Sequence, residues 1–155
     1  MQTTNRNVLI AVGVAVVAII LIVLFLLLRG GGSSTGGLTG TLWQLSSIRQ
    51  TTPAFQGVVP VEDQPRYAIT FNTNGTFSAK ADCNTLQGGY VAGTDGKLTL
   101  TPGPSTIVQC PEGSLSDLYI IGLDKVASYA IAGSQLTIKL DDQGTLVYKS
   151  ATPLP

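Results

Sequence analysis

The sequence contains no histidine, and this absence removes several kinds of active site. Neither a Ser-His-Asp triad nor a Cys-His nucleophile pair can form, and no imidazole is available to bind a metal ion. The two cysteines cannot complete a four-ligand zinc site by themselves. No Gly-x-Ser-x-Gly nucleophile elbow occurs either. We therefore expect no catalytic residue, no metal site and no bound cofactor.

An excess of charge of one sign is also missing. Nine Lys and Arg residues balance nine Asp and Glu residues, so the formal net charge at pH 7 is zero. A protein that binds nucleic acid needs a basic face to neutralise the phosphates. The composition therefore predicts no nucleic-acid partner.

Hydrophobic residues are concentrated near the start of the chain. From Val8 to Leu28 every residue except Gly13 is hydrophobic, and none is charged. As a helix this segment would be about 31 Å long, which matches a hydrocarbon core of about 30 Å. A secretory signal is usually shorter and ends in a small-x-small cleavage site, whereas this run ends at Arg29. We expect a transmembrane helix at residues 8–28 after a tail of residues 1–7, with a cleaved signal peptide as the alternative.

The rest of the chain predicts a linker and one β-rich domain. Residues 29–37 are rich in glycine and serine, as in flexible linkers, and residues 150–155 form a short tail. Between them, alternating hydrophobic residues and turn residues predict an antiparallel sheet or open barrel, a mainly β (α+β) fold. The expected strands are residues 42–48, 67–71, 77–81, 89–92, 97–101, 106–109, 129–132, 136–140 and 145–149.

Two segments of the domain at residues 38–149 do not have a strand pattern. Residues 111–127 have the hydrophobic spacing of one amphipathic helix, with Ser114 or Ser116 as the N-cap. Gly122 in this helix would allow a close approach by a neighbouring element. Residues 50–65, with three prolines, predict an irregular loop that is either a surface insertion or a binding loop.

Cys83 and Cys110 are the only cysteines, and they are too far apart for a C-x-x-C motif. A disulfide is the simplest interpretation if the domain lies outside the cytosol. Two buried free thiols in a cytosolic domain are the alternative. Because Arg6 and Arg29 leave the positive-inside rule nearly balanced, the disulfide decides the orientation. We expect a single-pass protein of a bacterial plasma membrane, in contact with the bilayer through residues 8–28, with its C-terminal domain outside.

Four segments, in order, resemble the META domain family of the heat-shock protein HslJ type. The resemblance covers residues 38–149. It implies a compact antiparallel β fold with one helix, often exported or membrane-attached, and a link to the bacterial envelope and stress responses without established enzyme chemistry. The segments are residues 38–45 (LTGTLWQL), 83–90 (CNTLQGGY), 106–111 (TIVQCP) and 118–136 (LYIIGLDKVASYAIAGSQL).

Asp82 departs from the family pattern, which usually has glycine before the Cys-Asn pair. If that position requires a positive φ angle, aspartate tolerates it less well than glycine. This departure puts the shape of the turn in question rather than the fold.

The motif residues have structural roles to play as well as functional ones. Trp43 would bury a large ring in a small core, and Asn84 would bond backbone groups near Cys83. Gly88 and Gly89 would permit a bulge before Tyr90. Asn84 and Tyr90 are also the candidate binding residues for an unknown protein or small-molecule partner.

Two functions remain open at this stage. The first is a non-catalytic binding or structural module in the cell envelope. The second is a small carboxylate-dependent hydrolase that uses residues such as Asp82 and Glu62, because the spacing of paired carboxylates is spatial and a sequence does not reveal it.

Overall fold

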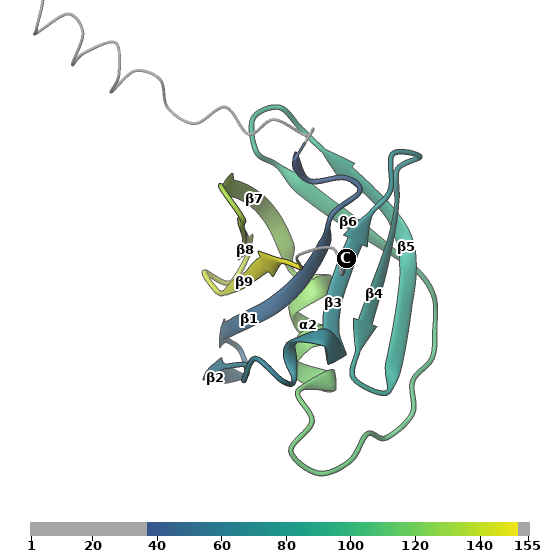
Figure 1. Cartoon of the computed structure of the whole chain (residues 1–155), viewed down its shortest axis with the longest axis vertical. Helices are drawn as coiled ribbons and strands as arrows, with labels where there is room; N and C mark the ends of the chain where they lie inside the picture. The colour runs from purple at the N-terminus through teal and green to yellow at the C-terminus, as the bar shows by residue number, and fades with distance from the viewer. Residues whose placement is uncertain (1–36, 152–155) are drawn as a thin grey trace, which may run out of the picture. The chain divides into compact units, whose positions relative to one another are not determined.

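The computed structural model describes residues 37–151, which form a curled antiparallel sheet with one α-helix (Figure 1). The strands are β1 (Leu42–Thr51), β2 (Ala54–Val58), β3 (Tyr67–Phe71), β4 (Thr76–Ala81), β5 (Asn84–Ala92), β6 (Leu98–Ser105), β7 (Val126–Ala132), β8 (Gln135–Leu140) and β9 (Thr145–Ser150). The helix is α2 (Ser116–Asp124), and a short 3-10 turn, η2 (Gln64–Arg66), precedes β3. The mainly β fold expected from the sequence is therefore confirmed for the domain.

The predicted transmembrane helix at residues 8–28 and most of the linker lie outside the described residues. Within residues 37–151, no helix has the length and apolar character needed to cross a membrane.

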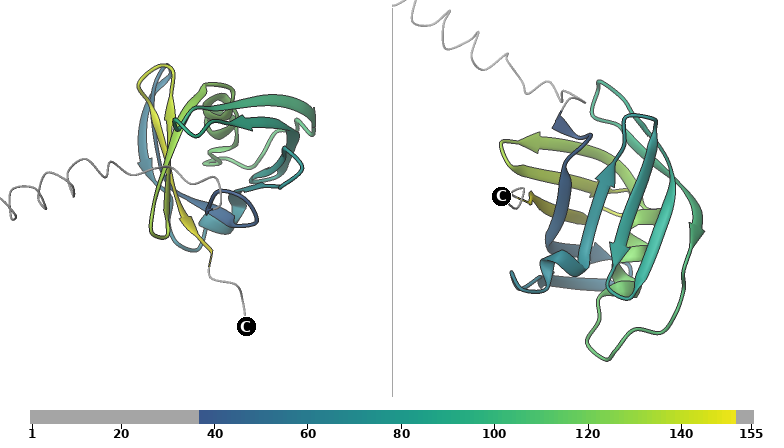
Figure 2. Two further views of the ribbon diagram at one scale, coloured as in Figure 1. Left: turned by 90° about the horizontal axis from the view of Figure 1, so that it is seen from above. Right: turned by 45° about the vertical axis from the view of Figure 1, so that its right-hand side comes forward.

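The sheet has the strand order β6-β5-β4-β3-β1-β9-β8-β7, with β2 paired to β1 off this path. Its two ends approach each other, because Lys97 and Ser128 form an isolated antiparallel bridge. The backbone N–H of Tyr129 also donates to the Gly96 carbonyl at 2.8 Å. The result is a half-barrel that curls around α2 (Figure 2).

Strict alternation of side chains fills the interior of this half-barrel. In β4, exposed and buried side chains alternate from exposed Thr76 and buried Phe77 to buried Ala81. This alternation is expected for a strand that has one face covered. Trp43 from β1 is almost fully buried, and its indole N–H donates to the Leu38 carbonyl at 3.0 Å. The core therefore satisfies the one polar atom of its largest ring, as buried tryptophans generally require.

Several of the turns contain a residue with a positive φ angle. Gly75 has a φ of 80° in the hairpin between β3 and β4, a conformation that glycine adopts at little cost. Asp82 has a φ of 59°, so the position before Cys83 does require the left-handed region. The bulge expected near Gly88 is present as a register shift between Leu86 and Gly88.

The predicted strand at residues 106–109 is wrong. This segment has no strand structure, although Ile107 and Val108 are hydrophobic; both side chains are exposed. The Val108 N–H donates to the side-chain oxygen of Asn84 at 2.8 Å rather than to a neighbouring strand. A side chain therefore takes the place that a strand partner would fill.

The helix is shorter than its hydrophobic spacing suggested. It covers Ser116–Asp124, and the residue at its N-cap is Leu115 rather than a serine. Ser114 nevertheless accepts a hydrogen bond from the Ser116 N–H at 3.2 Å. The close approach expected at Gly122 is present: a Cβ there would lie 2.7 Å from Gln50 Nε2 and 3.3 Å from a Leu146 methyl group.

The predicted loop at residues 50–65 is largely ordered secondary structure. β1 continues to Thr51, and the chain returns as β2, with Gln50 opposite Phe55 and Ser47 opposite Val58. Val58 is exposed, whereas Val59 is buried in the core. Prolines on both sides of β2 hid this hairpin in the sequence, because proline usually marks the absence of a strand.

Candidate binding cleft

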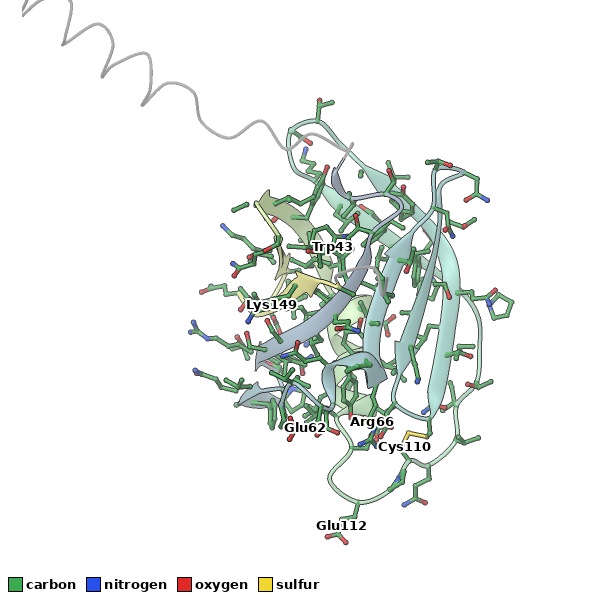
Figure 3. The ribbon with its side chains drawn as sticks, in the orientation of Figure 1. Trp43, Glu62, Arg66, Cys110, Glu112 and Lys149 are labelled. Atoms are coloured by element: carbon green, nitrogen blue, oxygen red, sulfur yellow. A yellow bond between two sulfur atoms is a disulfide. The ribbon has the colours of Figure 1, made fainter. Side chains whose placement is uncertain are left out.

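A cleft of about 420 Å³ opens at one end of the domain. One wall is formed by Phe55 and residues 57–60, from β2 and the turn after it, and the other by residues 112–115, which lead into α2. Asp63, Arg66 and Tyr67 complete the lining. A volume of this size lies within the range of about 300–1,000 Å³ that is typical of ligand sites. Figure 3 shows Arg66 and Glu112 at this end of the domain, with Glu112 at the tip of a loop.

Arg66 joins two carboxylates beside the cleft. Its Nη1 lies 3.1 Å from Asp63 Oδ1, and its Nη2 lies 2.7 Å from Asp82 Oδ1. The Arg66 side chain is 44% exposed, whereas that of Asp82 is only 7% exposed. The guanidinium is thus already neutralised from two sides, and it is not free to hold an anionic ligand as a single unpaired charge would be.

The ionisation of Asp82 reflects this environment. Burial would raise the pKa of Asp82, but the nearby Ser114 hydroxyl and the Arg66 guanidinium outweigh burial and hold the pKa below its usual value. Asp82 Oδ2 is buried and accepts no hydrogen bond of regular geometry within the described residues. Asp82 is a charged structural anchor rather than a proton donor at neutral pH.

Tyr67 fixes the wall of the cleft that leads into the helix. Its hydroxyl accepts a hydrogen bond from the Leu115 N–H at 2.9 Å and lies 3.4 Å from Ser114 Oγ. Its ring packs edge-on against Tyr119, with the centroids 6.0 Å apart. The start of β3 and the approach to α2 are therefore joined across the base of the cleft.

The disulfide expected between Cys83 and Cys110 is present, with the two Cα atoms 5.6 Å apart. It links the turn after β4 to the segment that continues to Glu112 and the cleft wall. Because the cross-link lies two residues before Glu112, it restrains the start of this wall, whereas Tyr67 binds the end of the wall at Leu115.

Asn84 lies deep in the structure and does not line the cleft. Its side chain is enclosed, with 1% of the residue exposed. The amide donates to the Val108 carbonyl and to Ser116 Oγ, both at 3.0 Å, and accepts from the Val108 N–H at 2.8 Å. These bonds use the hydrogen-bonding capacity that a ligand would need, so the structural role considered for Asn84 is the one the geometry supports.

Tyr90 lies near the other end of β5. Its hydroxyl donates to the Asn72 carbonyl at 2.8 Å, and its ring packs edge-on against Phe71 at 5.0 Å between centroids. Six residue-to-residue steps along the strand, or about 20 Å, separate it from Asn84. The structure does not bring these two candidate residues into one site.

The carboxylates of the hydrolase alternative are not joined either. Glu62 is exposed on the turn before η2, whereas Asp82 is buried against Arg66. No hydrogen bond or ion pair connects them within residues 37–151. The same residues contain no cluster of three or more Cys, Asp or Glu side chains placed to hold a metal ion.

The sequence pointed to one wall of the cleft, since residues 50–65 were a candidate binding loop, but it did not reveal the residues that complete the lining. Ser114 was noticed only as a helix cap, and Arg66, Tyr67 and Glu112 carried no motif. One local signal was available: Asp63 and Arg66 are three residues apart, the spacing at which side chains meet on one helical turn. Their meeting with Ser114 depends on chain segments nearly fifty residues apart.

Solved structures share this fold. The NMR structure of a protein from Burkholderia xenovorans has 27% sequence identity and a TM-score of 0.60, with 76% of this chain and 86% of that chain covered. A crystal structure of a duf4847 family protein from Bacteroides vulgatus has 14% identity and a TM-score of 0.54, over 74% of this chain and 95% of that one, and so shows the fold alone. No curated protein matches the sequence.

The family itself is shown by the sequence match. The META domain model matches residues 36–153, which include the nine strands and the α-helix of the part of the chain that the structure describes. The four segments that resembled this family correspond to β1, the start of β5, the segment that reaches Cys110, and the α2–β7 unit. The chain therefore belongs to the META domain family.

Proposed function

We propose that this protein is a membrane-tethered, non-catalytic binding module whose META domain lies outside the bacterial plasma membrane. Residues 8–28 would hold it in the bilayer, and residues 29–37 would give the domain freedom to move above the surface. The disulfide between Cys83 and Cys110 supports this side of the membrane, because such bonds persist in oxidising compartments. A role in envelope stress is consistent with this placement.

The observation that carries the binding role is the cleft between β2 and residues 112–115. It brings apolar side chains, including Phe55 and Leu115, beside polar groups that Tyr67 and Arg66 hold in fixed positions, and the polar part of the lining is the larger one. Polar groups in fixed positions within a concave site can orient a ligand. Asp63 and Asp82 beside the cleft are ion-paired to Arg66, whereas Glu112 in the opposite wall is exposed.

Protease shaving of intact cells tests the location. The domain should be digested without lysis, the chain should fractionate with membranes, and a variant that lacks residues 1–37 should be found in the soluble fraction. A domain that is protected in intact cells and digested only after lysis would overturn the proposed side of the membrane.

Chemical-shift mapping tests the binding role on the folded domain. We expect members of a panel of neutral, acidic and basic fragments to perturb the amides of residues 55–59 and 112–115. Val58→Trp should block the cleft, because Val58 lines it and is 80% exposed. Val91→Trp is the matched control, since Val91 is also exposed but lies on β5. The absence of any fragment in the cleft, or equal effects of the two variants, would contradict a binding role for it.

A further inference from the structure

We propose that the cleft accepts an extended peptide that pairs with the outer edge of β2 and carries a basic side chain. This inference rests on the proposed binding function and specifies the class of ligand. The occupant would be a segment of another protein in β conformation, bound through its backbone and selected by charge.

The pairing of β1 shows that β2 has an open edge. β9 pairs with residues 43–49 of β1. β3 pairs with residues 42–44 and β2 with residues 47–51, so both must lie along the opposite edge of β1. β4 continues the sheet beyond β3 but ends at Ala81, which is opposite Tyr67 at the start of β3. Within residues 37–151, no strand therefore covers the outer edge of β2.

The backbone groups at this edge have a defined direction. The Val59 N–H donates to the Ser46 carbonyl at 2.9 Å, toward β1. Because consecutive residues of an antiparallel strand point to opposite sides, Phe55 and Gly57 also face β1, whereas Ala54, Gln56 and Val58 face outward. The three outward residues are exposed. Their N–H and C=O groups are the template that a bound strand would use.

The contrast with β6, at one end of the sheet, supports a binding role for β2; β7, at the other end, is partly covered by the bridge between Lys97 and Ser128. β6 (Leu98–Ser105) carries Pro102 and Pro104, and proline is a common means of preventing unwanted strand pairing. β2 (Ala54–Val58) has neither proline nor charge, and its last residue is a highly exposed valine. An unprotected edge only five residues long suits a short peptide better than a long partner strand.

Charge at the cleft favours a basic side chain. Arg66 is opposed by both Asp63 and Asp82, which leaves an excess of negative charge around the guanidinium. Glu112 in the opposite wall is exposed and forms no ion pair among the described residues. A lysine or arginine from the peptide would meet Glu112, while apolar residues on the alternate face would contact Phe55 and Leu115.

The probe is the blocked peptide acetyl-Val-Lys-Val-Lys-Val-amide, titrated against the folded domain and followed by amide chemical shifts. We expect shifts at residues 54–58 and 112–115, and weaker binding of the matched peptide with glutamate in place of lysine. N-methylation of alternate peptide residues tests pairing directly. One set of methyl groups should abolish binding and the other should not, because only one set of N–H groups faces β2.

Two variants test the protein side. Glu112→Gln should weaken binding of the lysine peptide by about two- to fivefold, as expected for the loss of one exposed ion pair. It should not weaken binding of the glutamate peptide. Gln56→Pro removes an outward N–H without removing a backbone hydrogen bond to β1. It should weaken the binding of both peptides by about five- to tenfold. Lys139→Gln, on β8, is a charge-changing control that should leave binding unchanged.

The outcomes separate this inference from the broader function. Preference for the glutamate peptide, or equal effects of both N-methylation patterns, would overturn the proposal of a basic peptide strand paired with β2. The cleft would remain a binding site if other fragments occupy it. If neither peptides nor fragments perturb the cleft, both proposals fail.

Discussion

The side chain of Asn84 pairs with the backbone of Val108 as a neighbouring strand would. Its amide donates to the Val108 carbonyl at 3.0 Å and accepts from the Val108 N–H at 2.8 Å. These two hydrogen bonds attach the segment after β6 to the start of β5, one residue from the disulfide. The Cys-Asn pair is therefore a structural unit: the cysteine makes the covalent link and the asparagine supplies the polar one.

Asn84→Ala should destabilise the domain by about 2–3 kcal/mol, because it removes these bonds and the bond to buried Ser116. Urea unfolding of the oxidised protein measures the change. Gln87→Ala on the same strand is exposed and should remain within about 0.5 kcal/mol of the parent. An equally small effect at Asn84 would show that water replaces its partners without cost.

Replacing Cys83 and Cys110 together by serine should cost about 3.6 kcal/mol in the chain-entropy model, since the disulfide closes a loop of about 28 residues. Reduction of the parent protein should lower its unfolding free energy by a similar amount. The reductant should not change the stability of the double variant, which serves as the control. A reductant effect that persists in the double variant would point to a cause other than this bond.

Gly122→Ala should destabilise the domain although alanine favours a helix by about 1 kcal/mol. The new methyl group would meet Gln50 Nε2 at 2.7 Å, and Gln50 is held there by donating to the Leu118 carbonyl. We expect a net loss of about 1–3 kcal/mol in urea unfolding.

A Gln50→Ala/Gly122→Ala double variant checks the cause of that loss. It should cost less than the sum of its single variants, because the clash is shared between the two positions. A Gly122→Ala variant more stable than the parent would show that Gln50 and Leu146 move aside freely.

Acid should weaken the domain in part through Asp142. The hydrogen bond from Lys125 Nζ, at 2.9 Å, outweighs the opposing effect of burial and lowers the pKa of Asp142 in the folded state. This contribution is complete above the unfolded pKa of about 3.9 and is lost as the pH falls through the lower folded value.

Unfolding free energies measured between about pH 7 and pH 2 test this assignment. Asp142→Asn should reduce stability at neutral pH and flatten the decline in acid. Asp141→Asn changes an exposed neighbour with no ion pair among the described residues and should leave the decline unchanged. Parallel pH profiles for the parent and Asp142→Asn would refute the role of Asp142.

Local patterns predicted the strands whose side chains alternate. In β4 and β8 the apolar residues recur at every second position, and each strand shows that same alternation of buried and exposed residues. Alternation of apolar residues gave wrong strand predictions where the backbone pairing does not follow the hydrophobic pattern. Ile107 and Val108 suggested a strand but are exposed, and Phe55 lies in a strand between prolines that suggested a loop.

The sequence by itself determined the strand-rich character of the domain, the family and the two residues of the disulfide. Alternation of apolar residues, the order of the motifs and the presence of only two cysteines are, respectively, the signals for these features. Each signal is a property of short segments or of composition. Only the tertiary structure decided that Arg66, Asp82 and Ser114 meet beside a cleft and that β2 leaves an edge open. These contacts join residues far apart in the chain, and they exist because the curled sheet closes around α2, which no local period specifies.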